Sequence, residues 1–335
     1  MKFAAWLLAL AATLMGTQAQ AESQAPIVIK FSHVVASDTP KGKAAERFKQ
    51  LAERYTGGRV RVDVYPNNQL YKDKEELEAL QLGAVQMLAP SLAKFGPLGV
   101  REFEVFDLPY IFPSREVLYR VTEGPIGRGL LKKLESKGIT GLAYWDNGFK
   151  VMSANKPLHV PADFKGQKMR IQPSKVLDAQ MRALGASPLA LSFSEVYQAL
   201  QSGVVDGTEN PPSNFYTQKM YELQRHVTVS HHGYLGYAVI VNKKFWDGLP
   251  SSVRSDLEDA MRDATAYANA IARQENENAL EAIRKTGKTV VYNLTEKERD
   301  EWRRALIPVH KEMESRIGKD LISAVYREAA ETARK

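Results

Sequence analysis

Residues 251–287 constrain the fold more than any other part of the chain. They read SSVRSDLEDAMRDATAYANAIARQENENALEAIRKTG, with no proline and no glycine before the last position. This stretch predicts one helix of roughly 35 residues, about 50 Å long at 1.5 Å per residue. One small lobe cannot cover a helix of that length. We therefore expect two lobes, with this helix lying across both as their common backbone.

The length of the chain also favours two lobes. Residues 1–21 of the 335 have a charged start, the apolar run AAWLLALAATLMG and the cleavage signal Ala19-Gln20-Ala21, which together predict an export signal cut after Ala21. The remaining 314 residues exceed the size at which one core usually keeps growing. No later stretch offers about 18 consecutive apolar residues. We expect a soluble protein of the bacterial periplasm.

Composition excludes several classes of function. The chain has no cysteine, which excludes a lipid-anchor thiol, disulfides and thiolate metal sites. Its formal net charge of +7 favours anionic small molecules or an anionic membrane surface. Basic residues are interspersed with acidic ones and form no basic stripe, so we expect no binding to nucleic acid.

Strands and helices alternate along the chain, which is typical of an α/β fold with a largely parallel sheet and right-handed crossovers. The predicted elements of the first half are a strand at 27–34, a helix from 40 to near 57, a strand at 59–66, a helix at 72–82 and an apolar run at 85–90. Ligands bind at the carboxyl ends of such strands, where His33, residues 67–69 and Ser91 fall.

A second α/β pattern follows. Its predicted elements are a strand in KMRIQP, a helix in SKVLDAQMRALG, a strand in YLGYAVIVN, the long helix, a helix opened by Thr295 and a last helix from about Lys319. The predicted lobe I comprises 22–147 and about 237–275. The predicted lobe II comprises 148–236 and about 276–335.

The stretch FSEVYQALQSGVVDGTENP, residues 193–211, begins as a short amphipathic helix with a capping box formed by Ser192 and Glu195. Asp206-Gly207 predicts a turn. Asn210 is forced into an extended conformation by the prolines that follow it. An amide on so stiff a backbone belongs either to a surface loop or to a donor aimed at a ligand.

Two basic residues are placed unusually. Arg170 lies inside the apolar strand of KMRIQP, where its guanidinium needs either an internal carboxylate or a bidentate ligand carboxylate. Lys150 lies at the junction of the two patterns, where a hinge is expected, and is either solvent-exposed or part of a site. Asn147-Gly148 just before it is a turn signal.

Motifs of catalysis and metal binding are missing. The sequence has no G-x-S-x-G, G-x-G-x-x-G, Walker or H-E-x-x-H motif. Of six histidines only His226, His231 and His232 are close together, and no carboxylates at ligand spacing accompany them. We expect one buried and one exposed imidazole at a strand end, and we expect no metal, no cofactor and no catalytic residue.

The motifs KMRIQP, LGASPLAL and SFSEVYQALQSGVVDGTENP occur in an order that resembles the extracytoplasmic solute-binding proteins of tripartite ATP-independent periplasmic (TRAP) transporters. The resemblance covers essentially the whole mature chain. It implies two α/β lobes that close around a small carboxylate, a TRAP membrane permease as partner, and no enzymatic activity. It also implies that Arg170 and Asn210 hold the ligand carboxylate, that Phe193 lines the pocket, and that Lys150 replaces a second arginine of the sialic-acid-binding members.

The segment HVVASDTPKG resembles the C4-dicarboxylate-binding branch of that family. A dicarboxylate needs a second group of donors opposite Arg170, and we expect His33, Lys41 and Ser91 to provide it. Asn147 beside the hinge completes the predicted site. Three alternatives stay open: a different acid (a 2-oxo, aromatic or sugar acid), a sensory receptor, and a periplasmic enzyme using His33 and Lys41 as acid and base. We expect a monomer.

Overall fold

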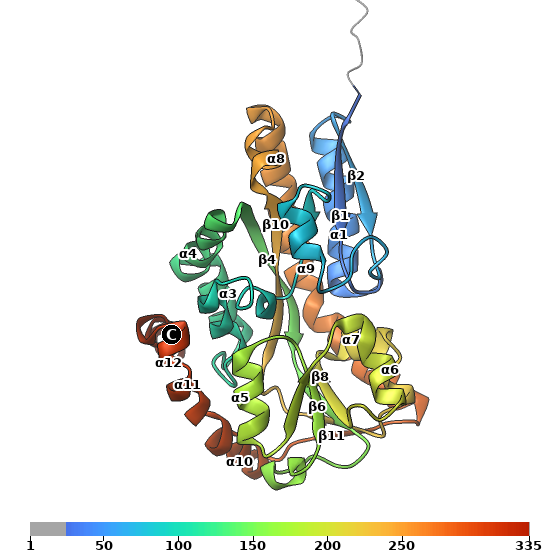
Figure 1. The fold of residues 1–335 in the computed structure, drawn as a ribbon, viewed down its shortest axis with the longest axis vertical. Coiled ribbons are helices and arrows are strands. Elements are labelled where there is room, and N and C mark those ends of the chain that lie inside the picture. Colours follow the sequence, from blue (N-terminus) through green and yellow to red (C-terminus); the bar gives the residue numbers. More distant parts are fainter. Residues whose placement is uncertain (1–24, 335) are drawn as a thin grey trace, which may run out of the picture.

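Two lobes, each built on one β-sheet, make up the protein (Figure 1). The structure is a computed structural model that describes residues 25–334, so the predicted signal and its cleavage site lie outside the described residues. Lobe I holds a five-stranded sheet of order β2-β1-β3-β10-β4, and lobe II a six-stranded sheet of order β11-β9-β5-β8-β6-β7. The predicted two-lobe α/β class is confirmed. Within residues 25–334, no helix is long and apolar enough to cross a membrane.

The elements follow the predicted alternation. The strands are β1 (Ile27–Ser32), β2 (Val60–Tyr65), β3 (Met87–Leu88), β4 (Ile139–Phe149), β5 (Val151–Ala154), β6 (Lys168–Ile171), β7 (Ser187–Ala190), β8 (Gly207–Asn210), β9 (His226–Val229), β10 (Tyr234–Asn242) and β11 (Val290–Asn293). The helices are α1 (Pro40–Tyr55), α2 (Glu76–Gln81), α3 (Arg115–Glu123), α4 (Pro125–Lys133), α5 (Lys175–Ala183), α6 (Val196–Gln201), α7 (Pro212–Thr217), α8 (Lys243–Asp247), α9 (Ser251–Thr286), α10 (Glu296–Leu306), α11 (Pro308–Glu312), α12 (Glu314–Ile317) and α13 (Lys319–Ala333).

The sequence predicts a largely parallel sheet, but only part of the lobe I sheet is parallel. Strands β2, β1 and β3 are parallel, but β10 runs antiparallel to both β3 and β4. The reason lies in the path of the chain. β4 carries the chain out of lobe I and β10 brings it back, so two neighbouring strands cross the boundary in opposite directions.

The crossing from lobe I to lobe II is very short. β4 ends at Phe149 in one sheet and β5 begins at Val151 in the other, so Lys150 alone joins them, as the predicted junction requires. The turn expected at Asn147-Gly148 is wrong. Both residues lie in β4, where the register skips between Leu235 and Gly236 and leaves Asn147 as the extra residue of a β-bulge. A bulge depends on the partner strand, which a local turn signal does not describe.

Helix α9 confirms the expectation from its sequence. It is 36 residues long. Its first part packs on α1 and β4 of lobe I, with Leu257, Ala260, Ala264 and Ala268 fully buried. Its last part packs on α7 of lobe II, where Ile283 joins another apolar cluster. The helix therefore lies across both lobes.

The predicted boundary of lobe II is wrong for the end of the chain. Helix α13 packs on α3 of lobe I, where Ile322 and Val325 join the same apolar cluster as Val117 (Figure 1). Arg120 of α3 also pairs with Glu328 at 2.8 Å. The apolar stripe of α13 predicts a helix that must be covered, but it does not indicate which lobe covers it.

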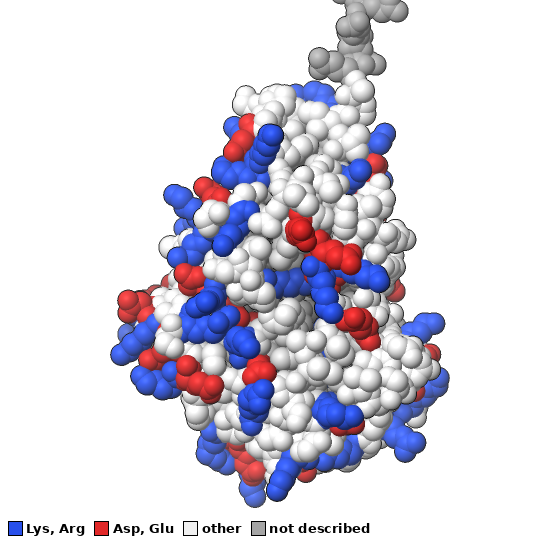
Figure 2. Space-filling view, in the orientation of Figure 1, with Lys and Arg blue, Asp and Glu red and all other residues white. Residues whose placement is uncertain are grey.

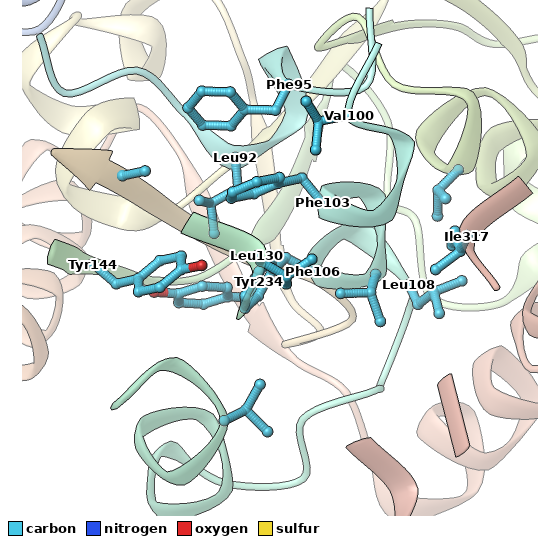
Figure 3. Packing of buried hydrophobic residues seen from close by; sticks show 14 of the residues in the cluster. Leu92, Phe95, Val100, Phe103, Phe106, Leu108, Leu130, Tyr144, Tyr234 and Ile317 are labelled. Carbon is cyan, nitrogen blue, oxygen red and sulfur yellow. The ribbon is translucent and has the colours of Figure 1, made fainter. Parts of the chain in front are cut away.

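The largest apolar cluster joins the two lobes. Phe95, Phe103, Phe106 and Tyr144 pack closely in lobe I (Figure 3), with the Phe95 and Phe103 ring centres 4.5 Å apart. Val176 of α5, in lobe II, belongs to the same cluster. The lobes therefore share a continuous core beside the cleft between them.

The stretch at 193–211 folds almost as predicted. A 3₁₀ turn over Phe193–Glu195 leads into α6, and the capping box of Ser192 and Glu195 is present. The turn expected at Asp206-Gly207 is wrong, because Gly207 is already the first residue of β8.

Charged side chains are mixed in sign over the surface, and the face in Figure 2 carries no continuous basic area.

Candidate ligand-binding site

A small cavity lies between the lobes. Its walls come from both lobes. They are formed by Val34, Val35, Lys41, Asp73, Ser91, Lys94, Gln172, Phe193, Asn210, Asn214, Leu235 and Tyr237. Of the predicted site residues, the walls therefore include Lys41, Ser91, Phe193 and Asn210, and they do not include Arg170, Lys150, His33 and Asn147.

Arg170 is a buried cation without a counterion. It lies on β6 with 2% of its surface exposed, and its Nε and Nη2 atoms donate to the carbonyl oxygen of Leu191 at 3.0 and 2.8 Å. No carboxylate lies within 4 Å of it among residues 25–334, and its Nη1 makes no hydrogen bond to any of them. Burial lowers the pKa of Arg170, although Asp73 and Glu209 oppose this effect. The guanidinium therefore lacks an internal ion pair and can take an anion.

Asn210 ends strand β8 and lines the cavity. Its backbone pairs with Val151, and the next residue, Pro211, begins the approach to α7, so the predicted extended conformation is present. The residue is 5% exposed, which rules out a surface loop. Its amide makes one long contact, from Nδ2 to Thr208 Oγ1 at 3.5 Å. The amide is therefore held in position with most of its bonding capacity unused.

Lys150 lies in a buried ion pair and not on the cavity wall. Its Nζ is 2.6 Å from Glu209 Oε1, and His232 Nε2 is 2.8 Å from the other oxygen of Glu209. Burial raises the pKa of Glu209, but Lys150 and His232 outweigh it and hold that pKa well below its usual range. Because neighbouring residues of a strand point to opposite faces, Glu209 turns away from Asn210. Solvent exposure is therefore wrong for Lys150, and a contact between Lys150 and a ligand stays a prediction.

Two buried lysines line the lobe I side of the cavity, and they differ in their partners. Lys94 pairs with Asp73 and Glu76. Lys41 donates to the carbonyl oxygen of Ala89 at 3.0 Å and lies 3.8 Å from the centre of the Tyr237 ring, with no carboxylate within 4 Å in the described chain. Burial lowers the pKa of Lys41 from 10.5 to about 7; Glu76 opposes this shift, and Lys94 adds to it. Lys41 is thus the lobe I counterpart of Arg170.

His33 lies behind the cavity wall rather than in it. It is 1% exposed, and neither ring nitrogen forms a hydrogen bond to another described residue. Burial and then the charge of Lys41 lower the pKa of His33 to about 3, so its imidazole is neutral at physiological pH. Its neighbours Val34 and Val35 form the wall itself.

The other histidines fit the prediction made for them, since His232 is buried and His231 is exposed. Within residues 25–334 no group of three or more His, Asp or Glu side chains could hold a metal ion.

Asn147 also lies outside the cavity wall. Its carbonyl oxygen accepts a bond from Asn276 Nδ2 at 2.5 Å, while its own side-chain oxygen and nitrogen are buried without partners among the described residues. The bulge thus fixes the backbone at Asn147 and leaves the amide group free for water or ligand atoms. A contact between Asn147 and a ligand stays a prediction.

The sequence analysis missed several residues of the cavity wall. Asn214 lies on α7, one turn after Asn210, and its Nδ2 donates to the hydroxyl oxygen of Tyr237 at 3.3 Å. Pro212 could have indicated the start of α7, because proline is favoured at the first helical position, but it does not indicate that Asn214 lines the cavity. Tyr237 and Asp73 carry no comparable local signal.

Contacts between the lobes close the cavity. Gln172 of lobe II donates to Ser91 Oγ of lobe I at 2.7 Å. The backbone N–H of Phe193 donates to Asp73 Oδ2 at 2.6 Å. Ser91 and Phe193, both predicted for the site, therefore also hold the lobes together.

We expect the Asp73→Asn variant to bind ligand about tenfold more weakly, because it weakens both the charge-assisted bond from the Phe193 N–H across the lobes and the buried ion pair with Lys94. Stopped-flow measurements should show the loss as faster dissociation. The matched control is Glu75→Gln, an exposed carboxylate on the same segment. An Asp73→Asn variant with unchanged dissociation would show that this bond does not stabilise the closed state.

Comparison with known proteins agrees with this geometry. Residues 31–316 match the family of bacterial extracellular solute-binding proteins, family 7. The chain is 69% identical over 306 residues to the C4-dicarboxylate-binding periplasmic protein DctP of Rhodobacter capsulatus, covering 91% of this chain and 92% of the relative.

Two solved structures are similar throughout. A TRAP periplasmic solute-binding protein of Sulfurospirillum deleyianum with bound succinate matches at 44% identity with a TM-score of 0.87, covering 90% of this chain and 99% of that one. A TRAP solute-binding protein of Pseudomonas aeruginosa with bound L-malate matches at 45% identity with a TM-score of 0.84, covering 86% and 100%. The chain belongs to family 7 of the bacterial extracellular solute-binding proteins, the solute receptors of TRAP transporters.

Proposed function

We propose that the protein captures a C4-dicarboxylate such as succinate, malate or fumarate between its lobes, in the periplasm, and delivers it to a TRAP membrane permease. One observation carries this proposal. Each lobe contributes one buried cation with no carboxylate within 4 Å among the described residues, Arg170 from lobe II and Lys41 from lobe I. A ligand with two carboxylates supplies one counterion to each.

The same arrangement explains why the ligand would favour closure. An unpaired buried charge is costly, and an anion that pairs with it removes much of that cost. An open protein offers each carboxylate only one lobe. Only the closed state satisfies both cations and both carboxylates, so a dicarboxylate shifts the population toward closure.

The relatives support the choice of ligand class. The Rhodobacter capsulatus relative is named for C4-dicarboxylate binding, and the two similar structures hold succinate and L-malate. We propose no covalent chemistry on the ligand and no cofactor. In this proposal the signal is cut after Ala21, the mature protein acts as a monomer, and the permease receives the ligand from the closed form.

Titration calorimetry tests the ligand class directly. The mature protein is unfolded and refolded to remove carried-over ligand, and then titrated with succinate, malate, pyruvate, benzoate and sialic acid. Micromolar or tighter binding of a C4 diacid supports the proposal. Binding confined to a monoacid or a sugar acid would reject the diacid, because Arg170 and Asn210 alone would serve those ligands equally well.

Affinity for a diacid should fall as the pH rises above about 7. Lys41 has a pKa of about 7 in the unliganded protein, and a bound carboxylate raises it. Between the two pKa values binding therefore takes up a proton, so affinity falls by up to about tenfold per pH unit above pH 7. Calorimetry at several pH values, in buffers of different ionisation enthalpy, measures both effects. Proton uptake of zero at pH 8 would contradict this role of Lys41.

A further inference from the structure

A second cleft lies where the chain crosses between the lobes, and it shares no wall residue with the cavity described above. Phe149 and His231 line it from the two crossings, Tyr110 from lobe I, and Arg299 and Arg303 from α10 of lobe II. The cleft thus lies beside two of the segments that pass between the lobes.

The charged groups of this cleft are basic. None of its wall residues is acidic. Arg299 has no carboxylate within 4 Å among residues 25–334, its Nε is buried without a partner there, and its one hydrogen bond, to the carbonyl oxygen of Leu294, is 3.5 Å long. Arg303 pairs with Asp300 at 3.1 Å and with Glu296 at 3.9 Å, and it lies 5.5 Å from the centre of the Tyr110 ring. Two guanidinium groups one helical turn apart therefore share a cleft, and one of them is unpaired.

The backbone around the cleft is strained. Tyr110 has φ of 57° and His231 has φ of 48°, both in the left-handed region that disfavours large side chains. The two segments are tied together, because the Tyr110 N–H donates to the carbonyl oxygen of His232 at 2.8 Å. Strain of this kind persists where the surroundings enforce it, and it is concentrated at binding sites and switch regions. Here it holds an aromatic ring and an imidazole beside the arginines.

We propose that this cleft binds a second small organic acid, with its carboxylate on Arg299 and Arg303 and its apolar body against Tyr110 and Phe149. The planar guanidinium suits a carboxylate, and the aromatic rings suit an apolar body. Because both crossings line the cleft, occupancy also depends on how far the lobes are closed. The second acid and the ligand of the main cavity then change each other's affinity by the same factor.

The site and the coupling are separate claims. Binding at the cleft does not depend on the proposed function, whereas the coupling rests on the closure of the lobes around a dicarboxylate. The two claims therefore need separate measurements. Loss of succinate binding would count against the proposed function and would leave the cleft site standing.

Benzoate is the probe for the site. Wild-type protein is saturated with succinate to fill the main cavity, and benzoate is added while the ring protons of His231 are followed by NMR, with a His231→Asn variant to assign them. We expect a saturable shift at millimolar benzoate or below, weakened at least tenfold in the double variant Arg299→Gln and Arg303→Gln. The matched control is Arg262→Gln with Arg273→Gln, two exposed arginines that pair with acids on α9.

Three outcomes would overturn the site. The His231 signals could fail to shift, or the control variant could lose as much affinity for benzoate as the Arg299→Gln and Arg303→Gln variant. Inorganic phosphate could also bind as tightly as benzoate, which would indicate a site for oxyanions that does not recognise the apolar part of an organic acid.

The coupling is tested by calorimetry with succinate, with and without benzoate. A change in succinate affinity in the wild type that disappears in the Arg299→Gln and Arg303→Gln variant supports it. Unchanged affinity in the wild type overturns it.

Discussion

Replacing Arg170 by alanine should weaken the binding of a C4 diacid about a thousandfold, or about 4 kcal/mol. The guanidinium is 2% exposed and has no carboxylate within 4 Å in the described chain, so in the proposed complex a ligand carboxylate is its counterion. Alanine leaves a ligand carboxylate buried without that partner. Calorimetry on refolded protein measures the loss, and circular dichroism checks that the variant is folded.

Two further variants sharpen the test of Arg170. Arg170→Lys keeps the charge but removes the planar fork, so it should recover only part of the affinity. Arg182→Ala is the matched control, because Arg182 is an exposed arginine of lobe II that pairs with Asp178 on the same helix. A loss of less than about threefold in Arg170→Ala would show that the ligand carboxylate binds elsewhere.

Replacing Lys41 by methionine should separate diacids from monoacids. Methionine fills similar space without the charge, so succinate should lose about a hundredfold in affinity while pyruvate loses less than about threefold. The reason is that, in the proposed complex, Lys41 faces the second carboxylate, which a monoacid lacks. Calorimetry with both acids on the same preparation measures the ratio of the two losses.

The matched control for Lys41 lies two residues further along. Lys43 is on the same helix, is partly exposed and pairs with Glu275 of α9 at 2.7 Å. Lys43→Met should leave both affinities unchanged. Equal losses for succinate and pyruvate in Lys41→Met would instead indicate a general effect on the cavity and would reject Lys41 as the second carboxylate partner.

The fold could be predicted from the sequence where local pattern decides it. An uninterrupted helical stretch was sufficient to predict α9, and Thr295 with Glu298 was sufficient to predict the start of α10. The predictions failed where the local structure depends on an element far away in the sequence. The bulge at Asn147 depends on β10, and the position of α13 depends on an apolar face of α3.

The residues of the site also separate into those that local sequence could predict and those that depend on distant partners. Asn210 and Phe193 line the cavity as predicted, and Arg170 is buried without an internal ion pair. The partner of Lys150 could not be predicted, because Glu209 lies 59 residues away in the sequence and meets it only when β5 pairs with β8. Whether these residues contact the ligand stays a prediction.

The single residue between β4 and β5 sets a limit on how this protein can change in length. Surface loops usually tolerate insertions. Here one extra residue would turn every side chain of β5 to the opposite face of its sheet. Val151 and Met152 belong to different apolar clusters, so each side chain would be moved into the cluster that now surrounds the other. An insertion of one residue at this crossing should therefore disrupt the packing of lobe II far more than an insertion in a surface loop.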